Sequence, residues 1–96
     1  MSKVLQIVIY KSIADDEKLA AYAKLSAPAM QAMGGRILAR GMPIAMKESG
    51  EPSRTVVIEW DSMEAAEAGY NSPGYQEALA ALDGAAEREF RYIEMA

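Results

Sequence analysis

The sequence predicts an α+β fold in which helices cover one face of a four-stranded antiparallel sheet. The first observation is the order of the predicted elements, β-α-β-β-α-β, along 96 residues. The second is length, because a chain of this size forms one modest core that buries roughly 60–70% of its unfolded surface. The third is composition, since 51% hydrophobic and 25% charged residues are typical of globular proteins. These features predict a single ferredoxin-like domain over residues 1–96.

The first strand and the first helix are predicted within the first 35 residues. Lys3–Ser12 is rich in β-branched and apolar side chains, which indicates a strand buried on both faces. The acidic run Asp15-Asp16-Glu17 favours a helix N-terminus, because the helix dipole stabilises negative charge there. Pro28 has no amide hydrogen to donate and should kink or split this helix. The pair Gly34-Gly35 predicts the end of the helix.

Three more strands follow from β-forming and alternating segments. Arg36–Gly41 and Ser53–Asp61 are predicted as strands joined by the loop Met42–Pro52, which is rich in proline, glycine and charge. Arg88–Met95 alternates between polar and apolar residues and predicts the fourth strand, which closes the sheet.

The second crossover is predicted to contain two helical segments. Asp61 or Ser62 caps the first, and Asp61 with Glu64 has the spacing of a capping box. Ser72 and Pro73 interrupt the helix and begin the next one, with serine as the N-cap and proline at the first helical position.

Alternation along the strands assigns two faces to the sheet. The side expected to contact the helices carries Leu5, Ile7, Ile9, Ile37, Ala39, Val56, Ile58 and Trp60. The opposite side is expected to carry Val4, Gln6, Val8, Tyr10, Arg36, Leu38, Arg40, Thr55, Val57 and Glu59. Four strands about 4.8 Å apart and about 20 Å long give a face of roughly 400 Å². Apolar patches of this size seldom stay exposed on a monomer, so we expect a homodimer that buries this sheet face about a two-fold axis.

The composition excludes several classes of site. The chain contains neither cysteine nor histidine, which removes thiolate nucleophiles, cysteine-ligated metals and the commonest general base. Asp15-Asp16-Glu17 cannot converge on one metal ion, so no metal and no cofactor are predicted. Fourteen acidic against ten basic residues argue against a nucleic-acid partner. The apolar run Val4–Tyr10 is too short to span a membrane, and a cytoplasmic protein is expected.

Three segments together resemble a known family. They are Gly34–Gly41 (GGRILARG), Val56–Ala66 (VVIEWDSMEAA) and Tyr70–Gln76 (YNSPGYQ). They are similar to the family of domain of unknown function 1330 (DUF1330), over about residues 10–94. The resemblance implies a dimeric α+β barrel with a ligand cavity between sheet and helices. Relatives in that superfamily include small monooxygenases, dehalogenases and isomerases, so the resemblance implies no particular reaction.

Two features of the family pattern are missing. Relatives commonly carry an arginine about seven residues after the tyrosine of the SP-x-YQ motif, where this chain has Leu82. If that arginine anchors an anionic ligand, this chain has lost or replaced the contact. Enzymes of the superfamily often use a histidine, which this chain lacks.

The candidate ligand-binding residues are arginines, tyrosines and one glutamate. Arg40 on an otherwise apolar face either holds a carboxylate bidentately or makes a structural contact, with Glu59 across the hairpin or with the partner chain of the dimer. Arg36 has the same two interpretations, and Glu59 is either a general base or an ion-pair partner. The tyrosines, which either contact a ligand or pack in the core, are Tyr10, Tyr22, Tyr70 and Tyr75.

Three classes of function follow. The first is a dimeric protein that binds a small, partly apolar organic molecule between sheet and helices. The second is a cofactor-independent enzyme of monooxygenase or isomerase type, in which Glu59 or a tyrosine would move protons. The third is a structural or interaction module without a ligand. The sequence leaves open whether the protein is an enzyme.

Overall fold

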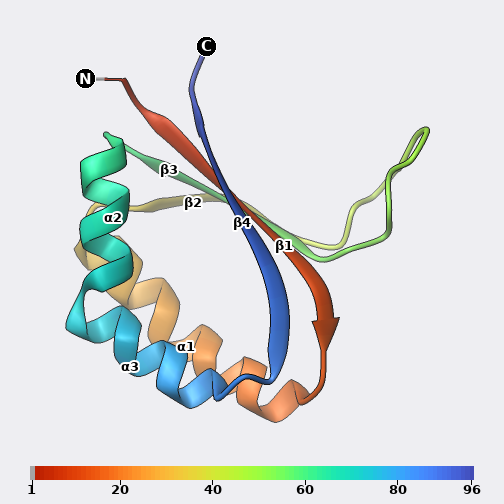
Figure 1. Ribbon diagram of the computed structural model, residues 1–96, viewed down its shortest axis with the longest axis horizontal. Helices are drawn as coiled ribbons and strands as arrows, with labels where there is room; N and C mark the ends of the chain where they lie inside the picture. Colours follow the sequence, from red (N-terminus) through yellow and green to blue (C-terminus); the bar gives the residue numbers. More distant parts are fainter. Residues whose placement is uncertain (1) are drawn as a thin grey trace.

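The computed structural model describes residues 2–96, whose elements follow the order β1-α1-β2-β3-α2-α3-β4 (Figure 1). The strands are Val4–Ile13 (β1), Arg36–Gly41 (β2), Thr55–Trp60 (β3) and Ala86–Glu94 (β4). The helices are Asp16–Ala32 (α1), Met63–Asn71 (α2) and Pro73–Leu82 (α3). This is the predicted ferredoxin-like arrangement, with two helices in the second crossover. Within residues 2–96, no helix combines the length and the apolar character needed to cross a membrane.

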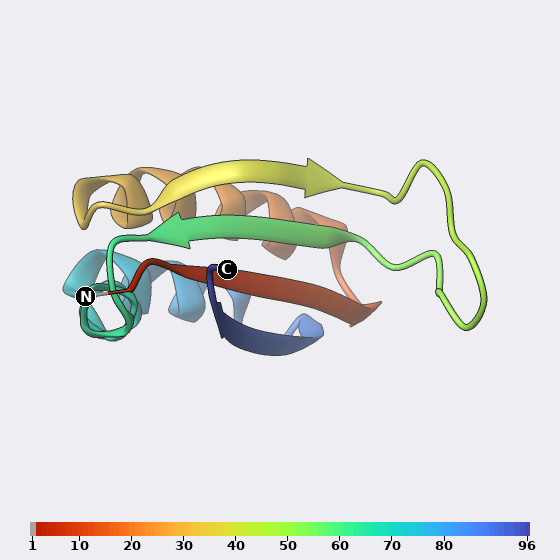
Figure 2. The ribbon, with the colours of Figure 1, turned by 90° about the horizontal axis from the view of Figure 1, so that it is seen from above.

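The sheet and the helices form two layers. The strands are antiparallel neighbours in the order β2-β3-β1-β4. Figure 2 shows the sheet in front of the three helices, which cover only one of its faces. The sheet therefore has a helix-facing side and an outer face.

Trp60 at the end of β3 is central to the core. Its side chain is 1% exposed, and its Nε1 donates a hydrogen bond to Oε1 of buried Gln6 at 2.9 Å. Gly69 of α2 lies against the indole so closely that an added Cβ would be 2.4 Å from the ring. Gly35, before β2, lies against the same ring, where a Cβ would be 2.9 Å away. Both glycines therefore allow backbone to approach the tryptophan.

The helix ends follow the predicted capping chemistry with one change. The Oδ1 of Asp15 accepts hydrogen bonds from the amides of Glu17 and Lys18 at the start of α1. The Oγ of Ser72 accepts from the amide of Tyr75 at 3.3 Å and so begins α3, as predicted. Ser62, one of the two predicted caps, caps α2, and the carboxylate of Asp61 accepts a hydrogen bond from Arg36 rather than forming the predicted capping box.

Pro28 does not split α1, contrary to one of the two predicted outcomes. The helix runs unbroken from Asp16 to Ala32 with the proline inside it. Pro28 lies at an exposed position. There it removes one hydrogen bond of the helix, while buried Ser26 and Met30 keep the flanking turns against the sheet.

The predicted faces of β1 are reversed in the structure. Directly opposite residues of antiparallel strands share a face, and Gln6 pairs with Ile58 while Val8 pairs with Val56. Val4, Gln6, Val8 and Tyr10 therefore face the helices. Leu5, Ile7 and Ile9 lie on the outer face. Both sets are mostly apolar, so hydrophobicity alone could not choose between them.

An irregularity in β2 also changes the predicted faces. The register shifts between Ile37 and Ala39, so that Ala39 pairs with Val57 and Arg40 with Val56. Arg40 therefore lies on the helix-facing side, and Ala39 on the outer face, which is the reverse of the prediction. Arg36 pairs with Glu59 and lies on the outer face, as predicted.

The outer face is largely apolar, although its residues differ from those predicted. Leu38, within the irregular segment, is 55% exposed, and Ile93 of β4 is 54% exposed. The residues that the register places on the outer face are Leu5, Ile7, Ile9, Arg36, Ala39, Thr55, Val57, Glu59, Glu89, Arg91 and Ile93.

Candidate functional site

A small cavity lies between α1 and the helix-facing side of the sheet. Its volume is about 50 Å³, which is room for a few water molecules or the end of a small ligand. Helix α1 contributes Tyr22, Ser26 and Met30 to its wall. The sheet contributes a larger set, which includes Gln6, Val8, Tyr10, Ile37, Arg40, Arg54, Val56, Ile58 and Arg88.

Three arginines line this cavity and no carboxylate does. Arg40 lies near the end of β2, Arg88 lies in β4, and Arg54 directly precedes β3. Among residues 2–96, none of these three arginines forms an ion pair within 4.0 Å. The Nε of Arg54 is buried without a hydrogen-bond partner in the described chain. A wall that carries three positive charges and no carboxylate is suited to a negatively charged group.

Aromatic rings hold Arg88 in place. Its guanidinium carbon lies 4.8 Å from the ring centre of Tyr22 and 4.9 Å from that of Phe90. It also lies 5.6 Å from the ring centre of Tyr10, and Arg54 lies 5.9 Å from the same ring. Such contacts stabilise a cation without neutralising it. The charge of Arg88 therefore remains available to a ligand.

A pair of tyrosines lies beside Arg88. Nη1 of Arg88 donates a hydrogen bond to the hydroxyl of Tyr22 at 2.8 Å. The hydroxyls of Tyr22 and Tyr75 are also 2.8 Å apart and buried. Burial and the neighbouring Tyr22 raise the pKa of Tyr75, so Tyr75 stays protonated at neutral pH. Tyr22 lines the cavity, whereas Tyr75 lies behind it.

Tyr10 and Gln6 complete the polar part of the wall. Burial and the proximity of Tyr22 raise the pKa of Tyr10, although nearby Arg88 opposes this shift. The Tyr10 side chain is therefore a neutral phenol at physiological pH. Gln6 is 4% exposed, and its bond to Trp60 fixes the orientation of its amide.

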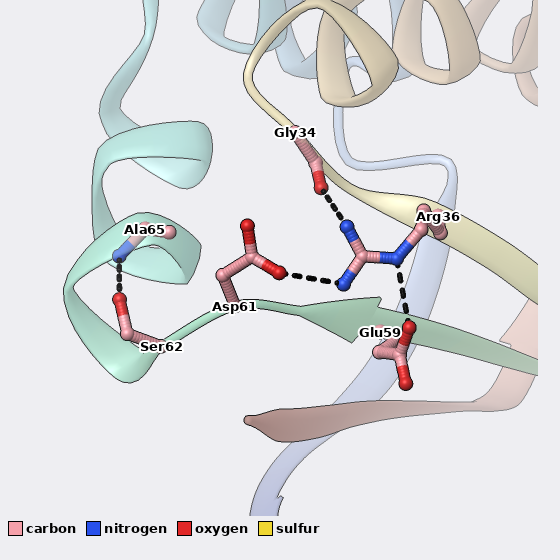
Figure 3. Close-up of polar contacts among 6 residues, drawn as sticks. All are labelled: Gly34, Arg36, Glu59, Asp61, Ser62 and Ala65. Carbon is pink, nitrogen blue, oxygen red and sulfur yellow. Dashed lines mark hydrogen bonds and ion pairs between the residues drawn. The ribbon is translucent and has the colours of Figure 1, made fainter. Parts of the chain in front are cut away.

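Arg36 and Glu59 do not reach this cavity. Nε of Arg36 donates to Oε1 of Glu59 at 2.7 Å, and Nη2 donates to Oδ1 of Asp61 at 2.9 Å (Figure 3). A third bond joins Nη1 to the carbonyl oxygen of Gly34 at 3.2 Å. The bonds to Glu59 and Asp61 raise the pKa of Arg36. Of the two interpretations of Arg36 and Glu59, the structure gives the ion pair, on the outer face.

Tyr70 lies in a separate groove between α2 and β4. This open groove has a volume of about 590 Å³ and is lined by Tyr70, Phe90 and Tyr92, with Glu67 and Arg88. Burial, followed by the charge of Glu67, raises the pKa of Tyr92 to about 12. Arg88 is shared by the cavity and the groove. The groove is therefore next to the cavity rather than part of it.

Arg54, Arg88 and Gln6 were not predicted as site residues. Arg54 lies two positions before Val56 and so shares the face of Val56, Ile58 and Trp60. The backbone bond from the amide of Tyr10 to the carbonyl of Arg54 at 2.9 Å confirms this placement. Arg88 alternates in the same way with Phe90 and Tyr92. The period of two along each strand was therefore the signal that could have found both arginines.

Leu82 is buried at 4% exposure within the hydrophobic core. At this position of α3, Leu82 therefore contributes to packing and carries no charge. The positive charges of the cavity come from Arg40 of β2, Arg88 of β4 and Arg54, which directly precedes β3.

The fold and the cavity define a ferredoxin-like protein with a cationic chamber between sheet and helix. The model of the family described as Domain of unknown function (DUF1330) matches residues 3–96. The chain therefore belongs to this family, as the sequence motifs predicted. A comparison with curated proteins finds no match.

Solved structures share this fold at low sequence identity. A protein of unknown function from Rhodopseudomonas palustris is 17% identical with a TM-score of 0.76, covering 99% of this chain and 83% of that chain. SnoaB, a cofactor-independent oxygenase from Streptomyces nogalater, is 13% identical with a TM-score of 0.64, covering 100% and 95%. A dimeric ferredoxin-like protein of unknown function from Thermobifida fusca is 18% identical with a TM-score of 0.63, covering 98% and 92%.

Proposed function

We propose that the protein is a homodimer that binds a small, partly apolar organic anion in the cavity between α1 and the sheet. The observation that carries this proposal is the set Arg40, Arg54 and Arg88, which lines one cavity without a carboxylate. Guanidinium groups bind carboxylates through paired, charge-assisted hydrogen bonds. A bound anion would supply the missing counter-charge.

The rest of the wall indicates the remainder of the ligand. Val8, Met30, Val56 and Ile58 present hydrocarbon to the same space. A ligand that places a carboxylate at the arginines and a short apolar group beside these side chains would satisfy both parts of the wall. The small volume favours a slender ligand end over a bulky one.

The dimer is the second part of the proposal. The outer face carries Leu5, Ile7, Ile9, Val57 and Ile93, and the structure covers it with no helix. Packing two such faces about a two-fold axis would remove this apolar surface from water. The dimeric protein from Thermobifida fusca has the same fold. We further propose that the chain acts as a single cytoplasmic domain, in keeping with its lack of cysteine.

Titration with butyrate tests the anion site, with butyramide as the neutral probe of the same shape. We expect wild-type protein to bind butyrate and to bind butyramide much more weakly, as measured by chemical-shift changes. Arg88→Met and Arg54→Met should each weaken butyrate binding by about 1.5–3 kcal/mol. Arg36→Met is the matched control, because this arginine is already paired on the outer face. Equal binding of the two probes, or an equal loss in the control, would overturn the anion site.

Native mass spectrometry of freshly purified protein tests assembly and ligand together. We expect a dimer that carries additional mass released by denaturation. A monomer at micromolar concentration would overturn the homodimer.

A cofactor-independent oxygenase is the second candidate, favoured by the hydroxyl of Tyr22 between Arg88 and Tyr75. That hydroxyl could exchange a proton with a phenolic or enolisable substrate at the arginines. Glu59 is too remote for this role because it lies on the outer face, bonded to Arg36. Oxygen uptake with a dihydroxynaphthalene tests this candidate. Turnover should be lost in Tyr22→Phe, and unchanged turnover would argue against the mechanism.

A further inference from the structure

The connection between β2 and β3 forms a long arm, which we define as residues 42–53. Figures 1 and 2 show that it extends well beyond the end of the sheet and away from the helices. Turn-like hydrogen bonds shape it, from the amide of Gly50 to the carbonyl of Lys47 and from the amide of Ser53 to that of Glu51. These bonds give the arm a defined backbone course, although it does not pack on the surface of its own chain.

The arm carries large apolar side chains in an exposed position. Ile44 is fully exposed, at 104% of its reference area, and Met42 and Met46 are 60% and 47% exposed. A single exposed apolar residue is ordinary. A projecting arm with such a residue at every second position from 42 to 46 is better explained by a surface that covers it.

The arm is continuous with the outer face. A groove of about 380 Å³ lies at its base, and its wall includes Ala39, Thr55, Val57, Met42, Pro43 and Ile44. The first three belong to the outer face, and the last three belong to the arm. Arg40 and Gly41 complete the wall, so the two regions form one continuous and mostly apolar surface that is interrupted by the charge of Arg40.

The size of the outer face indicates why an arm is needed. The sheet offers a flat area of roughly 400 Å². A stable interface usually buries about 800 Å² of accessible surface on each partner. Because side chains project from the sheet, its accessible surface exceeds its flat area, and the arm adds further area to the same surface. An interface made of both regions reaches the usual size more readily than the sheet alone.

We propose that the arm packs against the outer face of a second copy of this chain, with Ile44 as its central contact. We call this the arm contact, or grip. This inference rests on the homodimer of the proposed function and adds a contact outside the sheet. In a two-fold dimer each arm makes the same contact, so every residue of the arm acts twice.

The same contact would restrict the motion of two arginines of the cavity, Arg40 and Arg54. The arm begins two residues after Arg40 and ends immediately before Arg54, so its two ends are the strand ends that carry these arginines. Holding the arm against a partner fixes both ends. Dimer formation and anion binding should then favour each other by the same factor, as linkage requires.

Sedimentation equilibrium of Ile44→Ser tests the grip. Burial of an isoleucine side chain is substantial and is counted twice in the dimer, so the dimer dissociation constant should rise by about tenfold or more. Lys47→Ser is the matched control, because it alters the arm without removing an apolar side chain, and it should leave that constant within about twofold. Circular dichroism should show the same fold for both variants.

The outcomes separate this inference from the proposed dimer. A wild-type dimer that Ile44→Ser does not weaken would overturn the grip and leave the sheet-face dimer standing. A monomeric wild type would overturn both.

A crosslink gives a second measurement that does not depend on affinity. The chain has no cysteine, so Ile44→Cys provides one thiol for a benzophenone label. After irradiation we expect the label to join two chains, with the attachment mapped by mass spectrometry to β1, β3 or β4. Attachment only within one chain would overturn the grip.

Butyrate affinity tests the link to the cavity. At a concentration where wild-type protein is dimeric and Ile44→Ser is monomeric, the variant should bind butyrate several-fold more weakly. Equal affinities in the two states would overturn the link, and butyrate should correspondingly tighten the wild-type dimer.

Discussion

Arginines on the two faces of the sheet differ in whether they have carboxylate partners. On the outer face, Arg36 is bonded to Glu59 and Asp61, and Arg91 is bonded to Glu89. On the helix-facing side, the arginines of the cavity have aromatic neighbours and, within residues 2–96, no carboxylate within 4.0 Å. Charge is balanced on the outer face and unbalanced at the cavity, where Arg54 and Arg88 are partly buried and Arg40 is exposed.

This difference suggests separate roles for the two sets of arginines, a structural role on the outer face and a binding role at the cavity. Exposed ion pairs contribute little to stability and need no further explanation. Partly buried charges without an ionic partner, such as those of Arg54 and Arg88, cost more than exposed ones, so folding alone gives little reason to place them there. A ligand that brings negative charge is such a reason, and the two faces can be tested against each other.

The largest expected effect comes from adjacent residues of β3 that point to opposite faces. Ile58 is 1% exposed in the core, so Ile58→Ala should lower the free energy of unfolding by about 2–5 kcal/mol. That loss, measured by urea unfolding, should be the same at every protein concentration. Val57→Ala on the outer face should cost less, and its effect should change with protein concentration if the proposed partner chain covers Val57.

A concentration-independent effect of Val57→Ala would show that the outer face has no partner under those conditions. Val56→Ala is a useful control on the helix-facing side, because it removes the same atoms from a neighbouring position. Its effect should not change with concentration.

A smaller effect is expected from the polar contact inside the core. Gln6→Leu keeps a similar volume but leaves Nε1 of Trp60 buried without its acceptor. An unsatisfied buried donor costs about 1–3 kcal/mol, which thermal unfolding can measure. Gln6→Glu is the informative comparison, because it restores an acceptor but adds a negative charge on the wall of the cavity. A fully stable Gln6→Leu variant would contradict the role of this bond.

The position of Gln6 also shows where sequence analysis reached its limit. The element order and the Ser72-Pro73 helix start follow local rules of propensity and capping. The faces of β1 do not, because its two sets of side chains are almost equally apolar. What places Gln6 inside is a partner 54 residues away, the indole of Trp60, and single-strand patterns carry no such information.

The candidate site was predicted in part for the same reason. Tyr10, Tyr22 and Arg40 line the cavity, but Arg40 does so only because of the irregularity in β2, which reverses the alternation after Ile37. Arg54 was predictable from its spacing to Val56. The convergence of the three arginines, from β2, from β4 and from the residue before β3, depends on strand order, which alternation within one strand does not specify.

At alkaline pH the helix-facing side should lose stability. Burial and the charge of Glu67 raise the pKa of Tyr92 to about 12, above the ordinary value of about 10. The folded state therefore holds this proton after the unfolded chain has released it, so stability is complete below pH about 10 and falls as pH rises toward about 12. Tyr92→Phe should reduce this fall in unfolding experiments. An identical alkaline profile for the variant would show that Tyr92 ionises as freely as in the unfolded chain.

The smallest effect is expected at acid pH and belongs to the outer face. The hydrogen bond from Arg91 lowers the pKa of Glu89, with Lys11 as a weaker contributor. Stability from this pair is present above the ordinary pKa of glutamate and is lost as pH falls through the lowered value. Salt should weaken the effect if the pair is exposed to solvent, and Glu89→Gln should remove it. In a dimer the partner chain would cover Glu89, so an acid transition that resists salt and depends on protein concentration would indicate that the pair lies within the interface.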